Sequence, residues 1–304
     1  MLEEEISDFL GQEKTLLFST GYQANLGVIK TLVNRGDSIF SDKLNHASLI
    51  DGSIISRANF KRYRHNDCES LENLLNKSKS KSNLVVSDSL FSMDGDIANL
   101  QKIYSKVQNH GGLLLVDEAH ALGVYGENGR GLVNKSSLNK KLNTFITGTF
   151  GKAVGTFGAF FSGDKDSVDY IIQKARSYIY STSLPINAVE ATRKSLKIVE
   201  EENWRREKLF SLINYFRKNI NKSGFSVLDS SSQIQALLIG SSKDALYLSE
   251  ELFKNGIYIP AIRHPTVEEG KSRLRISITT DHQESDIDHL INILHTISRN
   301  LVQS

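Results

Sequence analysis

Short, continuously apolar runs alternate with longer helix-patterned stretches over the first 165 positions of this chain. The runs have the length of strands and occupy residues 15–19, 37–41, 83–87, 113–117, 144–148 and 159–162. Between them lie stretches with apolar residues three and four positions apart, such as 24–34, 70–78 and 100–110. Continuous apolarity is typical of strands buried on both faces. The alternation therefore predicts an α/β fold, with a mostly parallel sheet, helices on both of its faces, and ligands at the carboxyl ends of the strands.

The pattern changes after Pro185. One long amphipathic helix is predicted over residues 188–222, because its apolar residues recur at helical spacing. Shorter strand-like and helix-like segments follow it, at 233–239, 245–255, 257–262, 274–279 and from Glu284 onwards. We therefore expect two domains, a large one over residues 1–187 and a smaller C-terminal α+β domain over residues 188–304.

Composition excludes several classes of partner and site. Lys and Arg number 37 against 35 Asp and Glu, a net charge of +2, which argues against a nucleic-acid partner. No apolar run reaches the ~18 residues that a membrane span needs, and the acidic start is unlike a signal peptide. A single cysteine, Cys68, excludes an internal disulfide framework and CxxC-type metal sites. We expect a protein of the reducing cytoplasm that has no membrane segment and no metal.

One apolar strand ends in the sequence LLLVDEAHALG, which contains Asp117 and His120. DEAH at a strand end is one signature of helicase-like ATPases, where it holds magnesium. Such enzymes also need an upstream GxxxxGK[ST] loop that cradles phosphate. The only candidate is Gly270-Lys271-Ser272, which lies downstream and has Pro265 at the position of the first glycine. The ATPase interpretation is therefore disfavoured.

A second strand runs into TGTFGKAVG, which contains Lys152. Glycines and apolar residues around this lysine favour the neutral amine that Schiff-base chemistry requires. A lone Gly-Lys pair is more often an ordinary loop lysine. Two further features favour the chemical interpretation: a strand-end carboxylate at Asp117 can keep a pyridine nitrogen protonated, and the turn in 19–25 (STGYQAN) can bind phosphate through helix-start amides. Together, and in this order, they predict a pyridoxal-phosphate site.

The sequence resembles the α-oxoamine synthases, a family of fold-type I pyridoxal-phosphate transferases. The blocks that carry the resemblance extend from about residue 15 to residue 280: STGYQANLGVI, DKLNHASLIDG, YRHND, SDSLFSMDGDIANL, LLLVDEAHALGVYGENGRGL, TGTFGKAVGTFGAF, SYIYSTSLP and IRHPTVEEGKSRLRISIT. FSMDGD, DEAH and TFGK at these spacings are specific for the family and less so for the individual member.

The resemblance implies roles for particular residues in holding the cofactor. Lys152 would bond the cofactor aldehyde, Asp117 would pair with the pyridine nitrogen, and His120 would bond the phenolate oxygen. His46 would stack on the ring face and lie near the substrate. Further cofactor contacts would come from Gly21, Tyr22, Ser92 and Thr149.

Two residues near the C-terminus would bind substrate by the same resemblance. Arg263 would receive the amino-acid carboxylate in a bidentate pair, and Thr266 would lie near the acyl group. Taken singly, several of these residues have ordinary alternatives: His46 as a surface or core histidine, Tyr22 as a core aromatic, Ser92 as a turn residue and Arg263 as a surface arginine.

The reaction implied is decarboxylative condensation of an amino acid, expected to be L-alanine, with an acyl-CoA or acyl carrier protein. For the most similar members the acyl group is pimeloyl, in biotin synthesis, and a homodimer is expected. Glycine or serine with another acyl-CoA is one alternative. The other is an inactive cofactor-binding subunit, because family members carry a longer segment before the STGY-like block than the 18 residues that precede Ser19 here.

Overall fold

The computed structural model describes residues 1–303, and side chains as far as residue 299. It divides into two compact units. The larger unit comprises Met1–Phe91 and Ala98–Glu202, and the smaller one comprises Ser92–Ile97 and the chain from Asn203 onwards. The division thus falls later than the expected boundary after residue 187, and a short internal segment belongs with the smaller unit.

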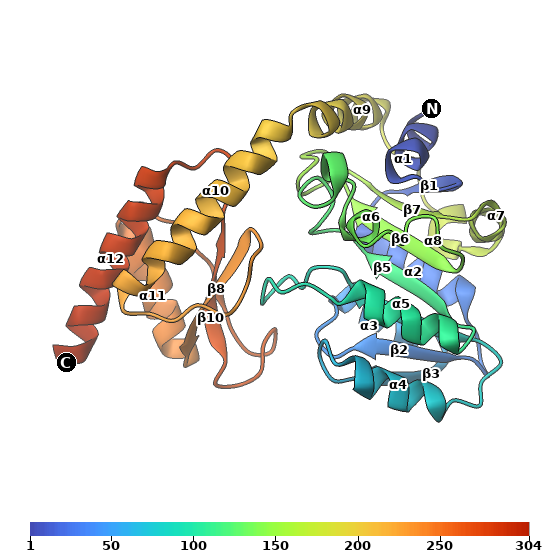
Figure 1. The fold of residues 1–304 in the computed structure, drawn as a ribbon, viewed down its shortest axis with the longest axis horizontal. Helices are drawn as coiled ribbons and strands as arrows, with labels where there is room; N and C mark the ends of the chain where they lie inside the picture. The colour runs from blue at the N-terminus through green and yellow to red at the C-terminus, as the bar shows by residue number, and fades with distance from the viewer. Residues whose placement is uncertain (304) are drawn as a thin grey trace. The chain divides into compact units, whose positions relative to one another are not determined.

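A seven-stranded sheet forms the centre of the larger unit (Figure 1). Its strands, in the spatial order β1-β7-β6-β5-β4-β2-β3, are β1 (Lys14–Phe18), β7 (Ala159–Gly163), β6 (Thr144–Thr149), β5 (Leu113–Asp117), β4 (Asn83–Asp88), β2 (Ser38–Asp42) and β3 (Asn59–Tyr63). Strand β7 pairs antiparallel with both of its neighbours, and every other pairing is parallel. The predicted mostly parallel sheet is confirmed.

Strand β3 is the one strand of this sheet that the sequence pattern missed. Its sequence, NFKRY, contains three polar residues and no continuous apolar run, and only Tyr63 is fully buried. It lies at the edge of the sheet, beside β2. An edge strand needs no continuous apolar run because one side is left open to solvent. The rule that identified the buried strands therefore could not identify this one.

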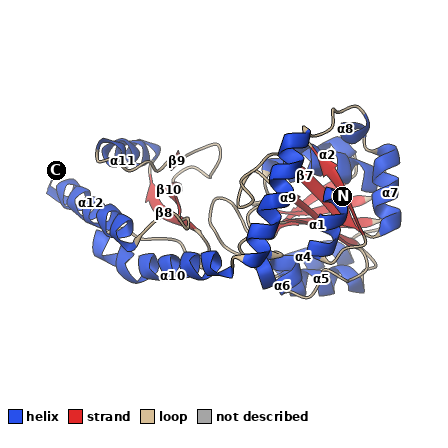
Figure 2. Cartoon of the chain, turned by 90° about the horizontal axis from the view of Figure 1, so that it is seen from above, coloured by secondary structure: helices blue, strands red, loops and turns tan. Residues whose placement is uncertain are grey.

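Helices cover both faces of the large sheet, as expected. They are α1 (Leu2–Leu10), α2 (Gly21–Leu32), α3 (Ala47–Ser56), α4 (Cys68–Asn76), α5 (Leu100–Asn109), α6 (Leu132–Lys135), α7 (Lys165–Lys174), α8 (Arg176–Ile179) and α9 (Ile186–Glu201). Figures 1 and 2 show α4, α5 and α6 on one face and α2 and α8 on the other. Apolar side chains of α2 pack on strand residues such as Phe18, Ile39 and Phe161 to form the core on that face.

The predicted helix over residues 188–222 is wrong as a single element. It is two helices, α9 and α10 (Asn203–Asn219), separated at Glu202, where φ is −95° and ψ is 65°. Helical spacing of apolar residues continues on both sides of the break, so periodicity alone could not detect it. The break coincides with the boundary between the two units.

The smaller unit is α+β, as expected. A three-stranded antiparallel sheet has the order β8-β10-β9. Its elements after α10 are β8 (Ile234–Gly240), α11 (Ser242–Lys254), β9 (Ala261–Ile262), β10 (Ser272–Ser277) and α12 (Glu284–Gln303). Buried residues of α10, including Leu212 and Phe216, contribute to its core.

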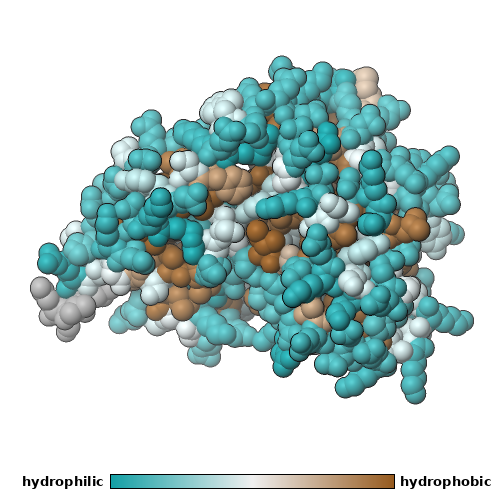
Figure 3. Space-filling view, viewed as in Figure 1, coloured by the Kyte–Doolittle hydropathy of each residue, from teal (hydrophilic) through white to brown (hydrophobic). Residues whose placement is uncertain are grey.

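No helix within residues 1–303 is long and apolar enough to cross a bilayer. The face of the molecule drawn in Figure 3 is mostly hydrophilic, and its hydrophobic residues lie in separate patches.

Candidate active site

Asp117 is the last residue of β5, a strand near the middle of the large sheet. Its side chain is only 6% exposed, yet both carboxylate oxygens accept hydrogen bonds. Asn25 Nδ2 donates to Oδ2 over 2.7 Å, and the backbone N–H of Ala119 donates to Oδ1 over 2.9 Å. The two neutral donors fix the carboxyl group in place, where it could pair with a cationic group.

Asn25, on α2, is the residue that orients this carboxylate. Its amide nitrogen also donates to Ser48 Oγ over 2.9 Å, and its amide oxygen accepts from Thr147 Oγ1 over 2.8 Å. The three contacts fix both ends of the amide. Because Asn25 is 1% exposed, water cannot replace these bonds, and the position of Asp117 is set by packing and hydrogen bonding together.

His46 belongs to the same network. Its Nδ1 lies 2.8 Å from Ser48 Oγ and accepts the backbone N–H of Ser48 over 3.3 Å, so the contacts with Asn25 reach from Asp117 to this imidazole. The backbone N–H of His46 donates to Asp88 Oδ2 over 2.7 Å. Burial lowers the pKa of His46, which favours the neutral ring. A neutral imidazole suits a residue that lies against an aromatic ring.

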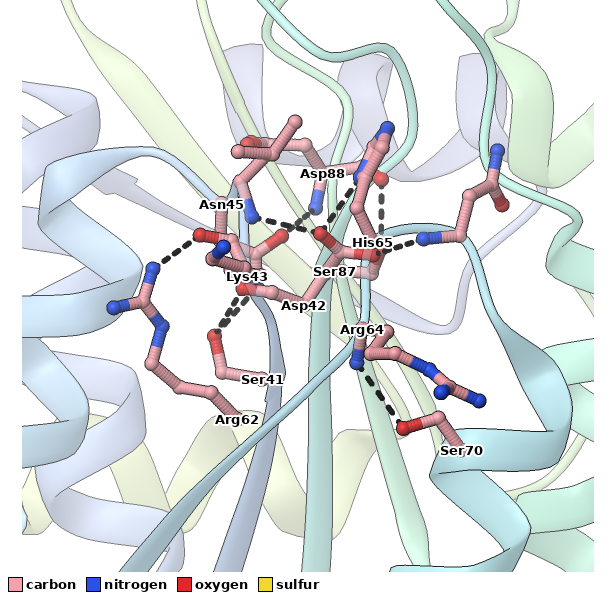
Figure 4. Close-up of polar contacts among 12 residues, drawn as sticks. Ser41, Asp42, Lys43, Asn45, Arg62, Arg64, His65, Ser70, Ser87 and Asp88 are labelled. Carbon is pink, nitrogen blue, oxygen red and sulfur yellow. Dashed lines mark hydrogen bonds and ion pairs between the residues drawn. The ribbon is translucent and has the colours of Figure 1, made fainter. Parts of the chain in front are cut away.

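Asp88 ends β4, next to the strand that ends in Asp117. Figure 4 shows Asp88 beside Asn45, whose Oδ1 accepts the backbone N–H of Asp88 over 2.9 Å. Burial, followed by the charge of Asp117, raises the pKa of Asp88 well above its ordinary value. The raised pKa favours the protonated form of Asp88.

Lys152 and His120 lie together at the exposed side of the site. Lys152 Nζ is 2.7 Å from His120 Nε2. Lys152 follows β6 in the turn after Thr149, whereas His120 follows β5. The lysine is exposed and the histidine half-buried. At this distance a proton can pass between the two nitrogens.

The predicted phosphate turn begins α2. Thr20 caps this twelve-residue helix by accepting the N–H of Gln23 with its side chain. A methyl group built on Gly21 would lie 3.7 Å from the Cβ of Thr149, so these two predicted contacts are neighbours. Tyr22 is 44% exposed and donates from its hydroxyl to Asp51. Helix-start amides, a hydroxyl and a glycine surface form a cradle of the kind that binds phosphate.

Glu118, directly after Asp117, is fully buried and has no role in the sequence-based prediction. It accepts the backbone N–H groups of Leu132 (3.0 Å) and Val133 (2.5 Å), at the start of α6, and the hydroxyl of Ser89 (3.1 Å). Burial raises its pKa to about 7, and the two backbone N–H groups partly oppose that rise. Glu118 thereby fixes the chain immediately after Asp117 to α6.

Three predicted site residues lie in the smaller unit: Ser92, Arg263 and Thr266. The backbone oxygen of Ser92 accepts Nε of Arg275 over 2.6 Å. Arg263 and Thr266 are exposed in the turn after β9, where the N–H of Thr266 donates to the carbonyl of Arg263 over 2.9 Å. The other seven predicted residues lie at or soon after the carboxyl ends of four strands of the large sheet, β1, β2, β5 and β6. The roles of all ten stay predictions.

The sequence reasoning missed Asn25, Asp88 and Glu118. Asp88 follows an apolar strand, as Asp117 does, and that shared position was a usable signal. Asn25 is a polar residue on the buried side of a helix, which is unusual unless it is hydrogen-bonded. Glu118 is a charged residue directly after a buried strand. The sequence could not show which groups these three side chains bond, because the bonding groups come from distant segments.

These residues fit pyridoxal phosphate. Asp117 provides a buried anion for a protonated ring nitrogen, Lys152 an amine for the aldehyde, and the start of α2 a set of amides for the phosphate. His46 and His120 are placed on separate loops that follow β2 and β5.

Comparison with known proteins agrees with this fit. Residues 1–294 match the model of the family "Aminotransferase class I and II". An 8-amino-7-oxononanoate synthase of Saccharophagus degradans is 47% identical over 98% of this chain and 75% of its own length. One from Nitrosococcus oceani is also 47% identical, over 96% of this chain and 78% of its own length. The chain belongs to this family of synthases.

Solved structures give the same result for the fold. A serine palmitoyltransferase from S. paucimobilis, whose ligand is the adduct of pyridoxal phosphate with myriocin, has a TM-score of 0.94 at 31% identity and covers all of this chain and 77% of its own. An 8-amino-7-oxononanoate synthase from Francisella tularensis has a TM-score of 0.86 at 31% identity, over 99% of this chain and 87% of its own. The predictions of a fold-type I transferase, of pyridoxal phosphate as cofactor and of the family are confirmed.

Proposed function

We propose that this chain condenses L-alanine with a pimeloyl thioester, of coenzyme A or of a carrier protein, to give 8-amino-7-oxononanoate, carbon dioxide and the free thiol. The reaction is a step of biotin synthesis. The support is the name shared by relatives that are 47% identical over nearly the whole chain, together with a site whose residues suit this chemistry.

The observation that carries the proposal is the placement of a carboxylate and an amine after two neighbouring strands. Asp117, buried and held by Asn25, ends β5, and Lys152 follows β6, the next strand of the sheet. When bound, pyridoxal phosphate supplies an electron sink for charge that develops at the amino-acid α-carbon. Asp117 stabilises that sink because it keeps a negative charge opposite the ring nitrogen.

The chain's own residues move the protons. Lys152 takes the proton from the α-carbon of alanine, and His120 at 2.7 Å assists because it can accept or return a proton at Lys152 Nζ. The electron pair left at the α-carbon forms a bond to the thioester carbonyl carbon. The carbon–sulfur bond breaks, its electron pair stays on sulfur, and the thiolate takes up a proton from solvent to give the free thiol. Loss of the carboxylate as carbon dioxide and return of one proton complete the product.

Substrate recognition is proposed for His46, Arg263 and Thr266. His46 would stack on the cofactor and lie near the amino acid, Arg263 would pair with the carboxylate, and Thr266 would lie near the acyl chain. In support, His46 is held at Ser48 and Asp88, and the Arg263 side chain is exposed. A planar guanidinium binds a carboxylate through two parallel hydrogen bonds.

A second candidate is condensation of serine with a long-chain acyl-CoA, because the serine palmitoyltransferase structure has the higher TM-score, 0.94 against 0.86. A TM-score measures the course of the backbone, which related enzymes share. Sequence identity reflects side chains, and it is 47% to the oxononanoate synthases of Saccharophagus degradans and Nitrosococcus oceani and 31% to that transferase. The alanine reaction is therefore the better-supported one.

The test is product analysis with purified protein and pyridoxal phosphate. Alanine, glycine and serine are each combined with pimeloyl-CoA, acetyl-CoA and palmitoyl-CoA, and free thiol and product mass are measured. We expect release of coenzyme A and the oxononanoate mass from alanine with pimeloyl-CoA only. A different pair would identify another member of the family. Cofactor binding with no thiol release from any pair would support the inactive subunit.

We also propose a cytoplasmic homodimer. Large apolar side chains of the larger unit are exposed on α3 and around α8, including Ile54 (58%), Ile55 (44%), Ile179 (45%) and Tyr180 (73%). A second copy would cover such side chains. The single cysteine, Cys68, is free, as suits a reducing compartment. Sedimentation of the wild type and of Ile54→Lys with Tyr180→Lys tests the dimer; a monomeric wild type would contradict it.

A further inference from the structure

The loop between β2 and α3, here called the 43–46 loop, carries His46. His46 is the N-cap residue of α3, so the end of this loop also sets where that helix begins. Each backbone N–H group of the loop donates to a neighbouring strand or strand end: Lys43 to the carbonyl of Tyr63 (3.1 Å), Leu44 to Asp42 Oδ1 (2.8 Å), Asn45 to the carbonyl of Asp42 (3.3 Å) and His46 to Asp88 Oδ2 (2.7 Å). The course of the loop is therefore specified by bonds to β2, β3 and β4.

Strand β2 stops pairing with β4 before β4 ends. The last pair between the two strands is Ser41 with Val86, whereas β4 continues beside β5 as far as Asp88. Where a neighbouring strand turns away, the backbone N–H and C=O groups on that side lose their ladder partners. Asp88 is only 4% exposed, and a buried N–H group needs an acceptor. Another group must therefore accept the N–H of Asp88.

The side-chain amide of Asn45 supplies that acceptor. Its Oδ1 accepts the N–H of Asp88 over 2.9 Å (Figure 4), and its Nδ2 donates to the carbonyl of Val86 over 2.8 Å. Nδ2 also donates to Ser41 Oγ over 2.8 Å, so both the nitrogen and the oxygen of the amide are bonded. A side-chain amide has the same kinds of donor and acceptor as a peptide unit. Asn45 thus continues the ladder along β4 where the backbone of β2 turns away.

Asn45 and Asp88 together hold His46. Asn45 precedes His46 in the chain, and Asp88 accepts the backbone N–H of His46 over 2.7 Å. Burial lowers the pKa of the His46 imidazole, and the nearby Asp117 and Lys152 also shift it, in opposite directions. The imidazole therefore lies within electrostatic reach of both candidate site residues, and all of these residues belong to the larger unit.

We propose that Asn45 is a positioning residue for His46: its side-chain amide takes the place of β2 backbone beside the end of β4, and so fixes Asp88 and the backbone of His46. Asn45 does not need to touch a ligand for this. The inference deepens the proposed function, and it rests on that function only for the use that is made of His46. It also gives a reason for the asparagine of the DKLNHASLIDG block.

The test measures hydrogen exchange at the backbone N–H of His46 in the full chain, with and without saturating pyridoxal phosphate. Labelling only histidine with ¹⁵N leaves eight backbone NMR signals, and His46→Gln identifies the one that belongs to His46. We expect Asn45→Ala to speed this exchange at least about tenfold, because the three bonds of the amide are lost. Asp88→Ala should do the same. Asp88→Asn keeps an oxygen that can accept the N–H, so its rate should stay within about threefold of the wild type.

Two controls separate a local change from a general loss of stability. Asn99→Ala removes another asparagine side chain of the larger unit that accepts a backbone N–H, that of Lys102, and should leave the exchange of His46 unchanged. The N–H of His110, which donates to the carbonyl of Val107 at the end of α5, is read in the same spectra. A general loss of stability would speed exchange at both histidines, whereas loss of the positioning bonds should speed it at His46 alone.

A second measurement follows the imidazole itself. Burial lowers the pKa of His46 in the wild type. In Asn45→Ala the released loop should admit water to the ring, so its pKa should rise toward the ordinary value of about 6.5. Ring-proton shifts recorded against pH measure it, and Asn99→Ala should titrate as the wild type does.

Several outcomes would overturn the inference. They are a wild-type exchange rate at His46 in Asn45→Ala, an increase that His110 shares, and an increase in Asp88→Ala without one in Asn45→Ala. If Asn45→Ala does not fold, Ser41→Ala decides, because it removes one acceptor of the Asn45 amide and leaves both bonds to β4. We expect exchange at His46 to rise about two- to fivefold in that variant. The wild-type rate there would equally overturn the inference.

The two proposals fail in different ways. If alanine and pimeloyl-CoA give no product but exchange at His46 follows the pattern above, the positioning role stands and the reaction is wrong. If the product forms as proposed and His46 exchanges at the wild-type rate in all variants, the reaction stands and the positioning role is wrong.

Discussion

The two sides of the candidate site are built differently. Asp117 is 6% exposed and is held by Asn25, which in turn contacts Thr147 and Ser48. Lys152, on the other side, is exposed and contacts His120. The buried side is held by a network of hydrogen bonds between distant segments, and the amine on the exposed side is open to solvent.

The difference matches the proposed role of each side. A carboxylate that stabilises charge works best when its position and its solvation are fixed in advance, since no reorganisation is then needed during the reaction. An amine that bonds to one partner and later gives it up must be able to move and to exchange protons. We therefore expect large losses of activity when the Lys152 amine or the Asp117 charge is removed. Changes in the residues that support these groups should have smaller effects.

Removing the amine is expected to have the largest effect. Lys152→Ala should lower turnover by about 10⁴-fold or more, because the group that bonds the cofactor and takes the proton is lost. The absorbance of the bonded cofactor near the visible edge should disappear, and borohydride should no longer attach the cofactor mass to the chain. Lys174→Ala, an exposed lysine of α7, is the control. An unchanged spectrum in Lys152→Ala would refute the assignment.

Neutralising the buried carboxylate is expected to have the second-largest effect. Asp117→Asn keeps the shape but removes the charge, so exchange of the α-proton of alanine with solvent should slow by about 10²- to 10³-fold while part of the cofactor still binds. Exchange is followed by NMR in deuterated buffer. Asp166→Asn, an exposed carboxylate of α7, should exchange at the wild-type rate. Wild-type exchange in Asp117→Asn would contradict its role.

The supporting amide should have a smaller effect. Asn25→Ala keeps the Asp117 side chain but removes its side-chain donor, at a cost of about 1.5–3 kcal/mol, or roughly 10- to 100-fold in α-proton exchange. Lys30→Gln, on the same helix, serves as the control. If Asn25→Ala exchanged as fast as the wild type, the buried side would not depend on prior organisation, and the comparison between the two sides would fail.

The raised pKa of Glu118 predicts that the free energy of unfolding depends on pH. Burial raises its pKa from the ordinary 4.5 to about 7. Between these pH values the unfolded chain has released a proton that the folded chain still holds, so stability falls as pH rises through this window and levels off above it. Glu118→Gln should remove this decline, which is on the order of 1–3 kcal/mol.

Urea unfolding of the cofactor-saturated protein at pH 5 and at pH 8 measures the decline. The stability difference between Glu118→Gln and the wild type should shift in favour of the variant on going to pH 8. A difference that is the same at both pH values would mean that Glu118 is ionised throughout, with its two backbone donors outweighing burial.

The smallest effect is expected on the exposed side. Tyr22→Phe keeps the ring and removes only the hydroxyl contact with Asp51, so cofactor affinity should change by no more than about twofold, as for most exposed substitutions. Titration with pyridoxal phosphate measures it, with Tyr170→Phe, another exposed tyrosine, as the control. A tenfold loss in Tyr22→Phe would show that the exposed side is organised as tightly as the buried one.

Much of the fold could be predicted from the sequence, and the errors have physical causes. Six strands of the large sheet were found because burial on both faces requires continuous apolarity. The edge strand β3 was missed because it does not. The break between α9 and α10 at Glu202 was missed because helical periodicity continues across it. Local sequence patterns indicate which residues are buried, but they do not show where a helix breaks.

The candidate site shows the same division. By itself, the sequence identified the candidate residues, because Asp117, Lys152, His120 and the start of α2 each have a local signature; their roles stay predictions. Only the tertiary structure decided which residues support them. Asn25 reaches Asp117 across 92 positions of chain, and Asn45 reaches Asp88 across 43. Hydrogen bonds between distant segments depend on how the sheet and its helices pack, and no local pattern of residues encodes that packing.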